Sequence, residues 1–467
     1  MLTRTEHDLL GEKEVPAERY YGIQTLRALE NFSITGTPIS KYPELIFALA
    51  HIKKAAALAN LELGLLSKEL AEAISAACDD ILSGRLVGEF VVDVIQGGAG
   101  TSTNMNANEV IANRGLELLG CEKGNYTRLH PLNHVNLSQS TNDVYPTALR
   151  LALSRKLDYL VREMGHLQTS LAAKGKEFKH VIKMGRTQLM DAVPMTLGQE
   201  FEAYAVMVGE DLQRVSEAQS LIREINMGAT AIGTGMNAHP KYAKLVTEKL
   251  KELTDVPVVS SSNLVEATQD AGAYVQLSGV LKRVAVKLSK ICNDLRLLSS
   301  GPRAGLAEIN LPPMAPGSSI MPGKVNPIIP EVVNQIAFEV IGNDVTVTMA
   351  AEAGQLELNA FEPVIAFNLF RSIDMLRRGC RTLAERCIDG ITANEERTSQ
   401  MVKNSIGLVT ALNPILGYEK STEIAAEALQ TGRAVYDIVL EKGYLSKEQL
   451  DEALSPENMT QPRYFHT

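Results

Sequence analysis

Apolar residues recur at every third or fourth position through the middle of the chain. Between Leu264 and Ser300, a stretch without proline, this spacing is kept by Ala271, Tyr274, Leu277, Leu281, Val284, Leu288, Ile291, Leu295 and Leu298. A stripe of this period is typical of an amphipathic helix. At about 1.5 Å per residue, one helix over the segment would be on the order of 55 Å long, which is typical of an extended bundle.

Further segments show the same helical pattern with no internal proline, over residues 151–178, 196–227, 331–360 and 363–389. We therefore predict a mainly α fold, in which an elongated central bundle of five long helices lies between smaller N- and C-terminal domains. The strings "LNPILGYEKSTEIAAEAL" and "LSKEQLDEAL" indicate short helices near the C-terminal end. We place the N-terminal domain at residues 1–139, the bundle at 140–395 and the C-terminal domain at 396–467.

The longest pattern is also apolar away from its main stripe, at Val275, Val280, Ala285, Val286 and Leu297. A helix that is apolar on more than one face usually needs partners on both sides. We expect subunits to associate through the bundle. The alternative is a thick core within a single chain.

Composition and charge exclude several classes of protein. The 467 residues are 45% hydrophobic and 22% charged, with a formal net charge of -9. An acidic balance without a basic run argues against nucleic acid or an anionic membrane as the main partner. No apolar run reaches the roughly 18 residues that span a bilayer, and the start "MLTRTEHDLLGEKEVPAERYYG" carries acids where a signal peptide is apolar. We expect a cytoplasmic protein.

Four loops combine small hydroxyl or amide side chains with glycine or proline, and each adjoins a long helical pattern. They are "GGAGTSTNMN" (97–106), "NLSQSTND" (136–143), "MGRTQLMDAVP" (184–194) and "APGSSIMPGKVNPIIPE" (315–331). Hydroxyls, amides and the free N–H groups of helix N-termini are suited to bind carboxylates. Each loop alone is more simply interpreted as turn and capping residues.

Other motifs in the chain fail on spacing. In "GSSIMPGKV" five residues separate the two glycines, where a P-loop has four, and Val325 stands where a P-loop needs Ser or Thr. The string "GTGMNA" follows a helical pattern, whereas a dinucleotide-binding fingerprint follows a strand. Pro131 separates His130 from His134, and five cysteines without a CxxC spacing indicate neither disulfides nor zinc. We therefore expect no metal site and no nucleotide or flavin cofactor.

Taken together, the loops resemble the aspartase/fumarase superfamily over essentially the whole chain. The string "GSSIMPGKVNP" from Gly317 matches the superfamily signature, and "SQSTNDVYPTA" and "SGPRAGLAEINLP" support it. Within the superfamily, "EVPAERYYGIQTLRALENF", "LVEATQDAGAYV" and "NPIIPEVVNQ" resemble the aspartases, whereas class II fumarases typically carry "NPTQCE" and a His where Gln188 stands. Met190 departs from the "QLQDAVP" usual in aspartases, and "HPLN" from His130 departs from the "HPND" anion site of fumarases.

The resemblance implies reversible deamination of L-aspartate to fumarate and ammonia without a cofactor. A proton leaves the carbon beside the β-carboxylate, and the doubly charged aci-carboxylate that forms must be stabilised by fixed donors. The superfamily assembles as a homotetramer in which three protomers contribute to each active site.

The resemblance also assigns roles to individual residues. Ser318 is implied as the base. The β-carboxylate is implied to contact Thr101, Ser140, Thr141 and Ser319, the α-carboxylate Thr187, Lys324 and Asn326, and the amino group Asn142 and Gln188. A serine base needs backbone N–H donors and a nearby cation to stabilise its alkoxide. Two alternatives stay open, a class II fumarase that hydrates fumarate to malate and a non-catalytic helical scaffold of the same fold.

Overall fold

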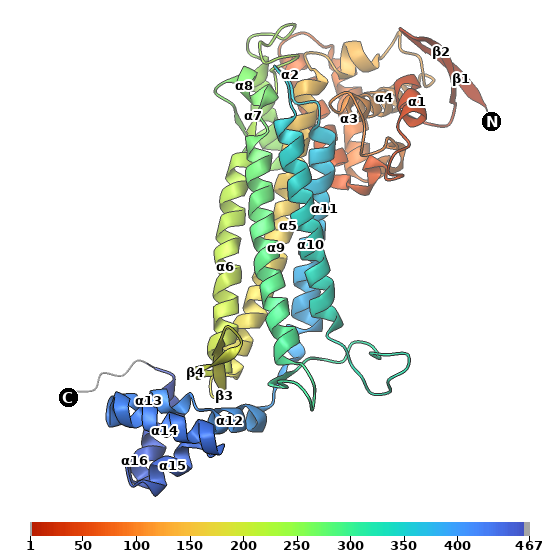
Figure 1. The fold of residues 1–467 in the computed structure, drawn as a ribbon. Coiled ribbons are helices and arrows are strands. Elements are labelled where there is room, and N and C mark those ends of the chain that lie inside the picture. Colours follow the sequence, from red (N-terminus) through yellow and green to blue (C-terminus); the bar gives the residue numbers. More distant parts are fainter. Residues whose placement is uncertain (1, 462–467) are drawn as a thin grey trace. The chain divides into compact units, whose positions relative to one another are not determined.

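The computed structural model describes residues 2–461 and is mainly helical (Figure 1). It divides into two compact units. Unit 1 comprises the residues up to Val161, Gln213–Arg283 and Phe338–Leu376, and unit 2 comprises Arg162–Leu212, Val284–Ala337 and the residues from Arg377 onward. No helix within residues 2–461 combines the length and the apolar character needed to cross a membrane.

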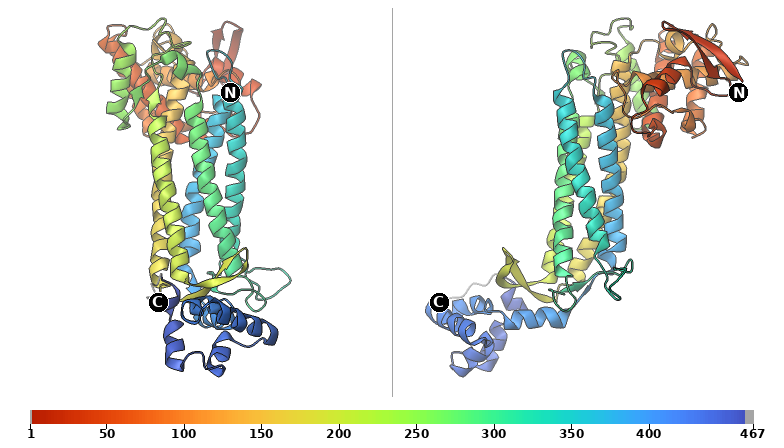
Figure 2. Two further views of the ribbon diagram at one scale, coloured as in Figure 1. Left: turned by 60° about the vertical axis from the view of Figure 1, so that its left-hand side comes forward. Right: turned by 45° about the vertical axis from the view of Figure 1, so that its right-hand side comes forward.

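Five long helices dominate the described part of the chain, and each contributes residues to both units: α5 (Thr141–Glu177), α6 (Leu197–Ile222), α9 (Gly272–Leu298), α10 (Ile328–Glu352) and α11 (Glu362–Arg386). Within each unit the segments of these helices run side by side (Figure 1, Figure 2). The prediction of a mainly α fold with five long helices is confirmed. The boundaries at 139 and 395 stay a prediction.

The predicted stripe of the longest pattern is confirmed, because all its positions from Ala271 to Leu298 are buried. The prediction of one continuous helix from Leu264 is wrong. A short helix, α8 (Leu264–Gln269), ends before Asp270, whose extended backbone interrupts the pattern and whose carboxylate accepts the N–H of Gly272 at 2.9 Å. Asp270 therefore caps the start of α9 instead of continuing α8.

Helix α5 begins at Thr141, ahead of the predicted start at 151, and contains Pro146. Proline inside a helix leaves the carbonyl four residues earlier without its usual donor. Here the carbonyl of Asn142 accepts a hydrogen bond from Asn226 Nδ2 at 3.0 Å. The Asn226 side chain thus compensates for the missing N–H, and the helix can start at the polar loop.

The remaining elements of unit 1 form around the ends of these helices: β1 (Thr3–Asp8), β2 (Gly11–Pro16), α1 (Ile23–Asn31), α2 (Pro43–Glu62), α3 (Lys68–Leu82), α4 (Thr101–Leu118), β5 (Glu224–Ile225), α7 (Tyr242–Thr254) and β6 (Val259–Ser260). Strands β1 and β2 form an antiparallel hairpin in which Thr3 lies opposite Pro16. Strands β5 and β6 pair in parallel. Helix α2 packs against α3 and α7, and α3 packs against α4.

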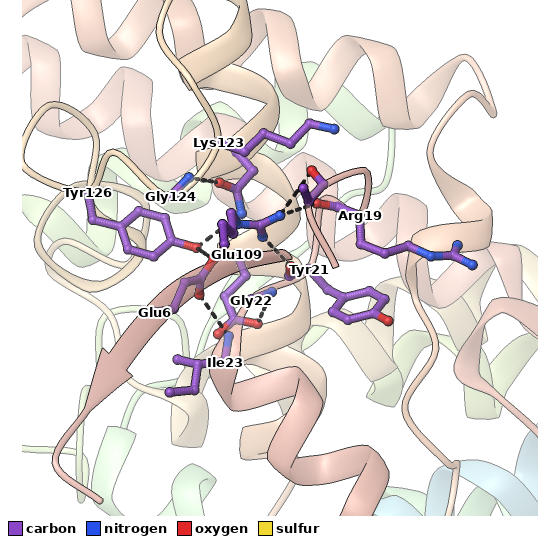
Figure 3. A network of polar contacts seen from close by, with 12 residues as sticks. Glu6, Arg19, Tyr21, Gly22, Ile23, Glu109, Lys123, Gly124 and Tyr126 are labelled. Carbon is purple, nitrogen blue, oxygen red and sulfur yellow. Dashed lines mark hydrogen bonds and ion pairs between the residues drawn. The ribbon is translucent and has the colours of Figure 1, made fainter. Parts of the chain in front are cut away.

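A buried carboxylate ties α1 to α4 (Figure 3). Glu109 of α4 accepts the N–H groups of Gly22, Gln24 and Thr25 and the hydroxyl of Thr25, at 2.6–3.1 Å. Gly22, the N-cap of α1, has no capping side chain, so Glu109 satisfies the free donors at that end. Burial nevertheless raises the pKa of Glu109 to about 7.

Unit 2 contains two short sheets and a group of small helices: β3 (Ile182–Thr187), β4 (Met190–Thr196), β7 (Ile309–Asn310), β8 (Thr392–Ala393), α12 (Glu395–Asn404), α13 (Leu408–Leu416), α14 (Tyr418–Thr431), α15 (Val435–Glu441), α16 (Lys447–Ala453) and α17 (Pro456–Met459). The short helices predicted near the C-terminal end are confirmed. Their apolar core, which includes Leu412, Ile424 and Leu450, also takes in Met184 of β3. The β3–β4 hairpin is therefore anchored on the small helices.

Candidate active site

The residues implied by the resemblance fall into two groups, one in each unit. Thr101, Ser140, Thr141 and Asn142 belong to unit 1, and Thr187, Gln188, Ser318, Ser319, Lys324 and Asn326 belong to unit 2.

In unit 1 the N-termini of α4 and α5 are neighbours. Gly100, the N-cap of α4, has a left-handed φ of 90°. A Cβ at this position would lie 2.3 Å from the ring of Tyr145, in the first turns of α5. Only glycine allows the two helix ends to approach this closely. Thr101 and Thr141, the first residues of α4 and α5, therefore lie at two adjacent helix N-termini, where free N–H groups and the helix dipoles favour an anion.

Behind Thr141 lies a network of amide side chains around a buried cation. Asn104 Nδ2 donates to Thr141 Oγ1 at 3.0 Å and to Asn136 Oδ1 at 3.1 Å. Lys53, which is completely buried, donates to the same Asn136 oxygen and to Gln139 Oε1, both at 2.9 Å. Because Thr141 Oγ1 accepts from Asn104, its own O–H is left to donate to a ligand.

The loop before α5 is fixed by a second buried charge, the carboxylate of Asp143. It accepts the N–H of Ser140 at 3.0 Å and those of Gly228 and Thr230 at 3.2 and 2.9 Å. Burial raises the pKa of Asp143 and lowers that of Lys53, and each charge partly offsets the shift of the other. The two buried charged groups thus hold the loop through different partners, Lys53 through Asn136 and Gln139 and Asp143 through backbone N–H groups.

The hydroxyls at these helix ends differ in how free they are. Ser140 Oγ accepts the N–H of Asn142 at 3.2 Å, a capping bond that leaves its O–H available. Thr101 Oγ1 donates to the carbonyl of Gly98 at 2.7 Å. Its proton must therefore change partner before it can bind a carboxylate. Asn142 Nδ2 donates to the carbonyl of Ala231 at 2.7 Å.

In unit 2, Thr187 and Gln188 lie at the tip of the β3–β4 hairpin. Thr187 pairs with Met190, so the turn consists of Gln188 and Leu189, which have positive φ of 53° and 64°. A turn of this kind normally needs Gly, Asn or Asp, and other residues cost about 1 kcal/mol or more each. Strain retained at Gln188 is typical of a functional position. Met190 is 71% exposed at this tip.

Ser318 lies in the loop between β7 and α10, and its hydroxyl oxygen faces two backbone donors. Ser318 Oγ accepts the N–H of Ile320 at 3.2 Å and that of Met321 at 3.0 Å. Such donors favour the negative form of an oxygen. A serine base needs such backbone donors to stabilise its alkoxide.

The same loop closes on itself around Gly317. Asn326 Nδ2 donates to the Gly317 carbonyl at 2.6 Å, and a Cβ on Gly317 would lie 2.0 Å from the carbonyl oxygen of Lys324. Ser319 and Lys324 are exposed, and Ser318 and Asn326 are half-buried. The loop thus presents two hydroxyls, one cation and one amide from a short closed segment.

The structure brings together the implied residues of unit 1, but not those of unit 2. Among the residues that the structure describes, no hydrogen bond joins the turn at Gln188 to residues 311–327. Sequence reasoning missed the supporting residues Lys53 and Asp143. The signal for Lys53 was a charged residue within the apolar run "ALAHIKKAAALAN". The signal for Asp143 was an acid three residues after Ser140, the spacing of a helix-capping pattern.

A metal site does not emerge from the described side chains, since nowhere in residues 2–461 do three or more His, Cys, Asp or Glu residues gather as ligands. His130 and His134 are used locally. His134 Nδ1 accepts the N–H of His130, and His130 Nδ1 accepts those of Leu132 and Asn133. The expectation that the protein needs no cofactor stays a prediction.

Known protein families and solved structures show which class of protein this chain resembles. Residues 11–342 match the family model "Lyase", and residues 408–461 match "Fumarase C C-terminus". In structure, the chain is similar to a fumarate lyase:delta crystallin from Brucella melitensis bound to cobalt, with TM-score 0.97 and 55% identity, covering 99% of this chain and 100% of that one. A class II fumarase from Schistosoma mansoni gives TM-score 0.94 and 36% identity, with the same coverage. The chain therefore has the fold of a lyase family.

The curated relatives narrow the class. An aspartate ammonia-lyase of Helicobacter pylori (strain ATCC 700392 / 26695) is 61% identical over 462 residues, covering 99% of both chains. That of Escherichia coli (strain K12) is 54% identical over 462 residues, covering 99% of this chain and 97% of the relative. The chain belongs to the aspartate ammonia-lyase family of the aspartase/fumarase superfamily.

Proposed function

We propose that the protein is a carbon–nitrogen lyase that reversibly deaminates L-aspartate to fumarate and ammonia, with Ser318 as the base. The activity is supported by aspartate ammonia-lyase relatives 54–61% identical over nearly the whole chain, against 36% for a class II fumarase. The role of Ser318 is supported by the two backbone N–H groups that face its hydroxyl oxygen.

In the proposed first step, the Ser318 alkoxide removes a proton from the carbon beside the β-carboxylate. The electron pair moves into that carboxylate, which becomes a doubly charged aci-carboxylate. Thr101, Ser140, Thr141 and Ser319 donate hydrogen bonds to it. Their support is the free O–H of Thr141 and Ser140 and the buried charges that fix the loop behind them.

In the second step, the electron pair returns to form the double bond of fumarate and the C–N bond breaks. Lys324, Asn326 and Thr187 hold the α-carboxylate, and Gln188 and Asn142 bind the amino group that leaves as ammonia. Gln188 suits this role because its amide oxygen accepts from an ammonium without titrating near neutral pH. Ser318 keeps the abstracted proton during this step and releases it to solvent after the products leave, which restores the alkoxide.

A homotetramer with sites shared between protomers follows from the family resemblance. The exposed apolar side chains of α10 within unit 1 support association. Phe338, Val345 and Met349 are 64%, 56% and 66% exposed, and their spacings of seven and four positions place them on one helix face. Large apolar residues exposed in such a row are typical of an interface. We also propose that the enzyme is cytoplasmic and binds neither nucleic acid nor membrane.

The direct test mixes the purified protein with L-aspartate and follows fumarate absorbance and ammonia release in parallel. We expect equal amounts of both products. Rapid formation of malate from fumarate, with no ammonia released from aspartate, would favour the fumarase alternative. No turnover with any four-carbon dicarboxylate would favour a non-catalytic scaffold.

A further inference from the structure

Glu308 is a buried acid outside the set of residues assigned so far. Its side chain is completely buried in unit 2, just before β7. Its backbone is held on both sides, since its N–H donates to the carbonyl of Leu298 at 2.9 Å and its carbonyl accepts the N–H of Asn394 at 2.9 Å. The carboxylate therefore has a fixed position.

Two cations of β3 meet this carboxylate. Arg186 Nη1 donates to Glu308 Oε1 at 2.5 Å, and Lys183 Nζ lies 3.3 Å from Glu308 Oε2. Lys183 also contacts Glu200 of α6, and this pair is nearly buried. Charges buried away from water interact strongly, and leaving one of them unpaired lowers the stability of the folded state. The carboxylate thus fixes the strand at two points.

Each partner of this ion pair is directly connected to a segment of the candidate site. Arg186 is followed in the chain by Thr187 and Gln188, at the strained turn. Glu308 is followed by β7 and then by residues 311–327, which carry Ser318. One buried side chain therefore links the hairpin that carries two site residues to the base of the loop that carries four more.

We infer that Glu308 is a positioning residue. Through Arg186 and Lys183 it holds the hairpin of Thr187 and Gln188 in a fixed position relative to the Ser318 loop. This inference rests on the proposed deamination. Misplacement of reacting groups by about 1 Å can cost about a hundredfold in rate. Loss of the Glu308 charge should therefore reduce turnover although the carboxylate does not contact substrate.

The test compares Glu308→Gln with Asp211→Asn in the full-length enzyme. Asp211 is a matched control, because it is also an almost completely buried carboxylate of unit 2 and pairs with Lys287 at 3.1 Å. Both variants should lower the melting temperature. We expect Glu308→Gln to reduce kcat/KM for aspartate by about tenfold to a hundredfold, and Asp211→Asn to leave it within about threefold of wild type. Equal losses in the two variants would overturn the inference.

Arg186→Gln removes the Arg186–Glu308 ion pair between the hairpin and the loop and keeps the Lys183–Glu308 pair. It is the second test variant if Glu308→Gln does not fold. It should raise KM and leave kcat nearly unchanged, whereas Glu308→Gln should raise KM and lower kcat. In the double variant the KM effect should be no larger than in either single one, because both remove the same contact. Additive effects on KM would contradict action through Arg186.

Backbone hydrogen exchange gives a readout that does not depend on activity. Glu308→Gln should accelerate exchange in residues 185–191 and 311–327, and Asp211→Asn should accelerate neither. If the wild type failed to deaminate aspartate, the proposed function would be wrong, and the exchange pattern would still decide whether Glu308 holds the two segments. Unchanged exchange in both segments would remove that role.

Discussion

The two groups of candidate residues are built in opposite ways. In unit 1, the hydroxyls at the starts of α4 and α5 rest on Lys53 and Asp143, which are buried and multiply hydrogen-bonded. In unit 2, the Ser318 loop is mostly exposed, and the hydrogen bonds of Ser318 and Asn326 are made within the loop. Fixed donors stabilise a developing charge without reorganising, whereas a base on a loop with few outside contacts can move. We interpret the first group as the rigid electrostatic part of the site and the second as its movable part.

The largest expected effect on turnover comes from the movable part. Ser318→Ala should reduce kcat by about a hundredfold or more, because the general base is lost. The melting temperature should change little, since the loop contributes little to the core. Steady-state kinetics and thermal unfolding of the same preparation check both halves of this prediction. Near-normal turnover would exclude Ser318 as the base.

In the rigid part, Asp143→Ala should lower the stability of the protein strongly and its turnover less than Ser318→Ala does. The variant leaves the N–H groups of Ser140, Gly228 and Thr230 without their acceptor and a buried Lys53 without its counter-charge. Breaking a buried charge network costs about 3–5 kcal/mol. Urea denaturation should show a lower midpoint, and turnover should fall by about tenfold as the loop loses its conformation.

Asp79→Ala is the control for this variant. Asp79 is an acid of unit 1 that pairs with Lys54 at the surface. An exposed pair contributes little to stability. A loss of stability in Asp79→Ala as large as that in Asp143→Ala would show that the buried network has no special weight.

Gln188 lies on a hairpin that is intermediate between the rigid and the movable part, because its base is anchored and its tip is exposed. Gln188→Ala should raise the KM for aspartate by about tenfold, as expected for the loss of a hydrogen bond to a charged group. Gln188→His should raise it less, and fumarate should bind both variants as product. Kinetics measured in both reaction directions separate these effects. Unchanged aspartate kinetics in Gln188→Ala would remove Gln188 from the amino group.

Glu362, at the start of α11, should have the smallest effect on turnover. Its expected effect is on how stability depends on pH. Burial raises the pKa of Glu362 from 4.5 to about 8, and Arg150 opposes the shift. Between these values the folded state keeps the proton and the unfolded state loses it. Stability should therefore be greatest below pH 4.5 for this group and fall as pH rises to about 8, by at most about 1.4 kcal/mol per pH unit.

The Glu362 prediction is checked by urea midpoints of wild type and Glu362→Gln across this pH range. The variant lacks the titrating group, so its stability should depend less steeply on pH. Parallel curves for the two proteins would contradict the assignment. Turnover at fixed pH should differ little between them.

The apolar pattern was sufficient to predict the long helices, because burial of one face dominates their formation. It failed at Asp270, where one side chain favours a cap over continuation of the helix. The candidate loops could be recognised from their strings. Their supports could not, because Lys53 lies far in the chain from Asn136, and Glu308 far from Arg186. Long-range pairs of this kind leave no periodic signal in a single sequence.

The closure of the loop at Gly317 affects how mutational scans should be interpreted. A single added methyl group would collide with the Lys324 carbonyl, so alanine here should inactivate the enzyme for a steric reason alone. Gly323, in the same loop, has open space around it but a left-handed φ of 82°. Intolerance at these two glycines would therefore report on backbone shape, and only substitutions at their polar neighbours would report on chemistry.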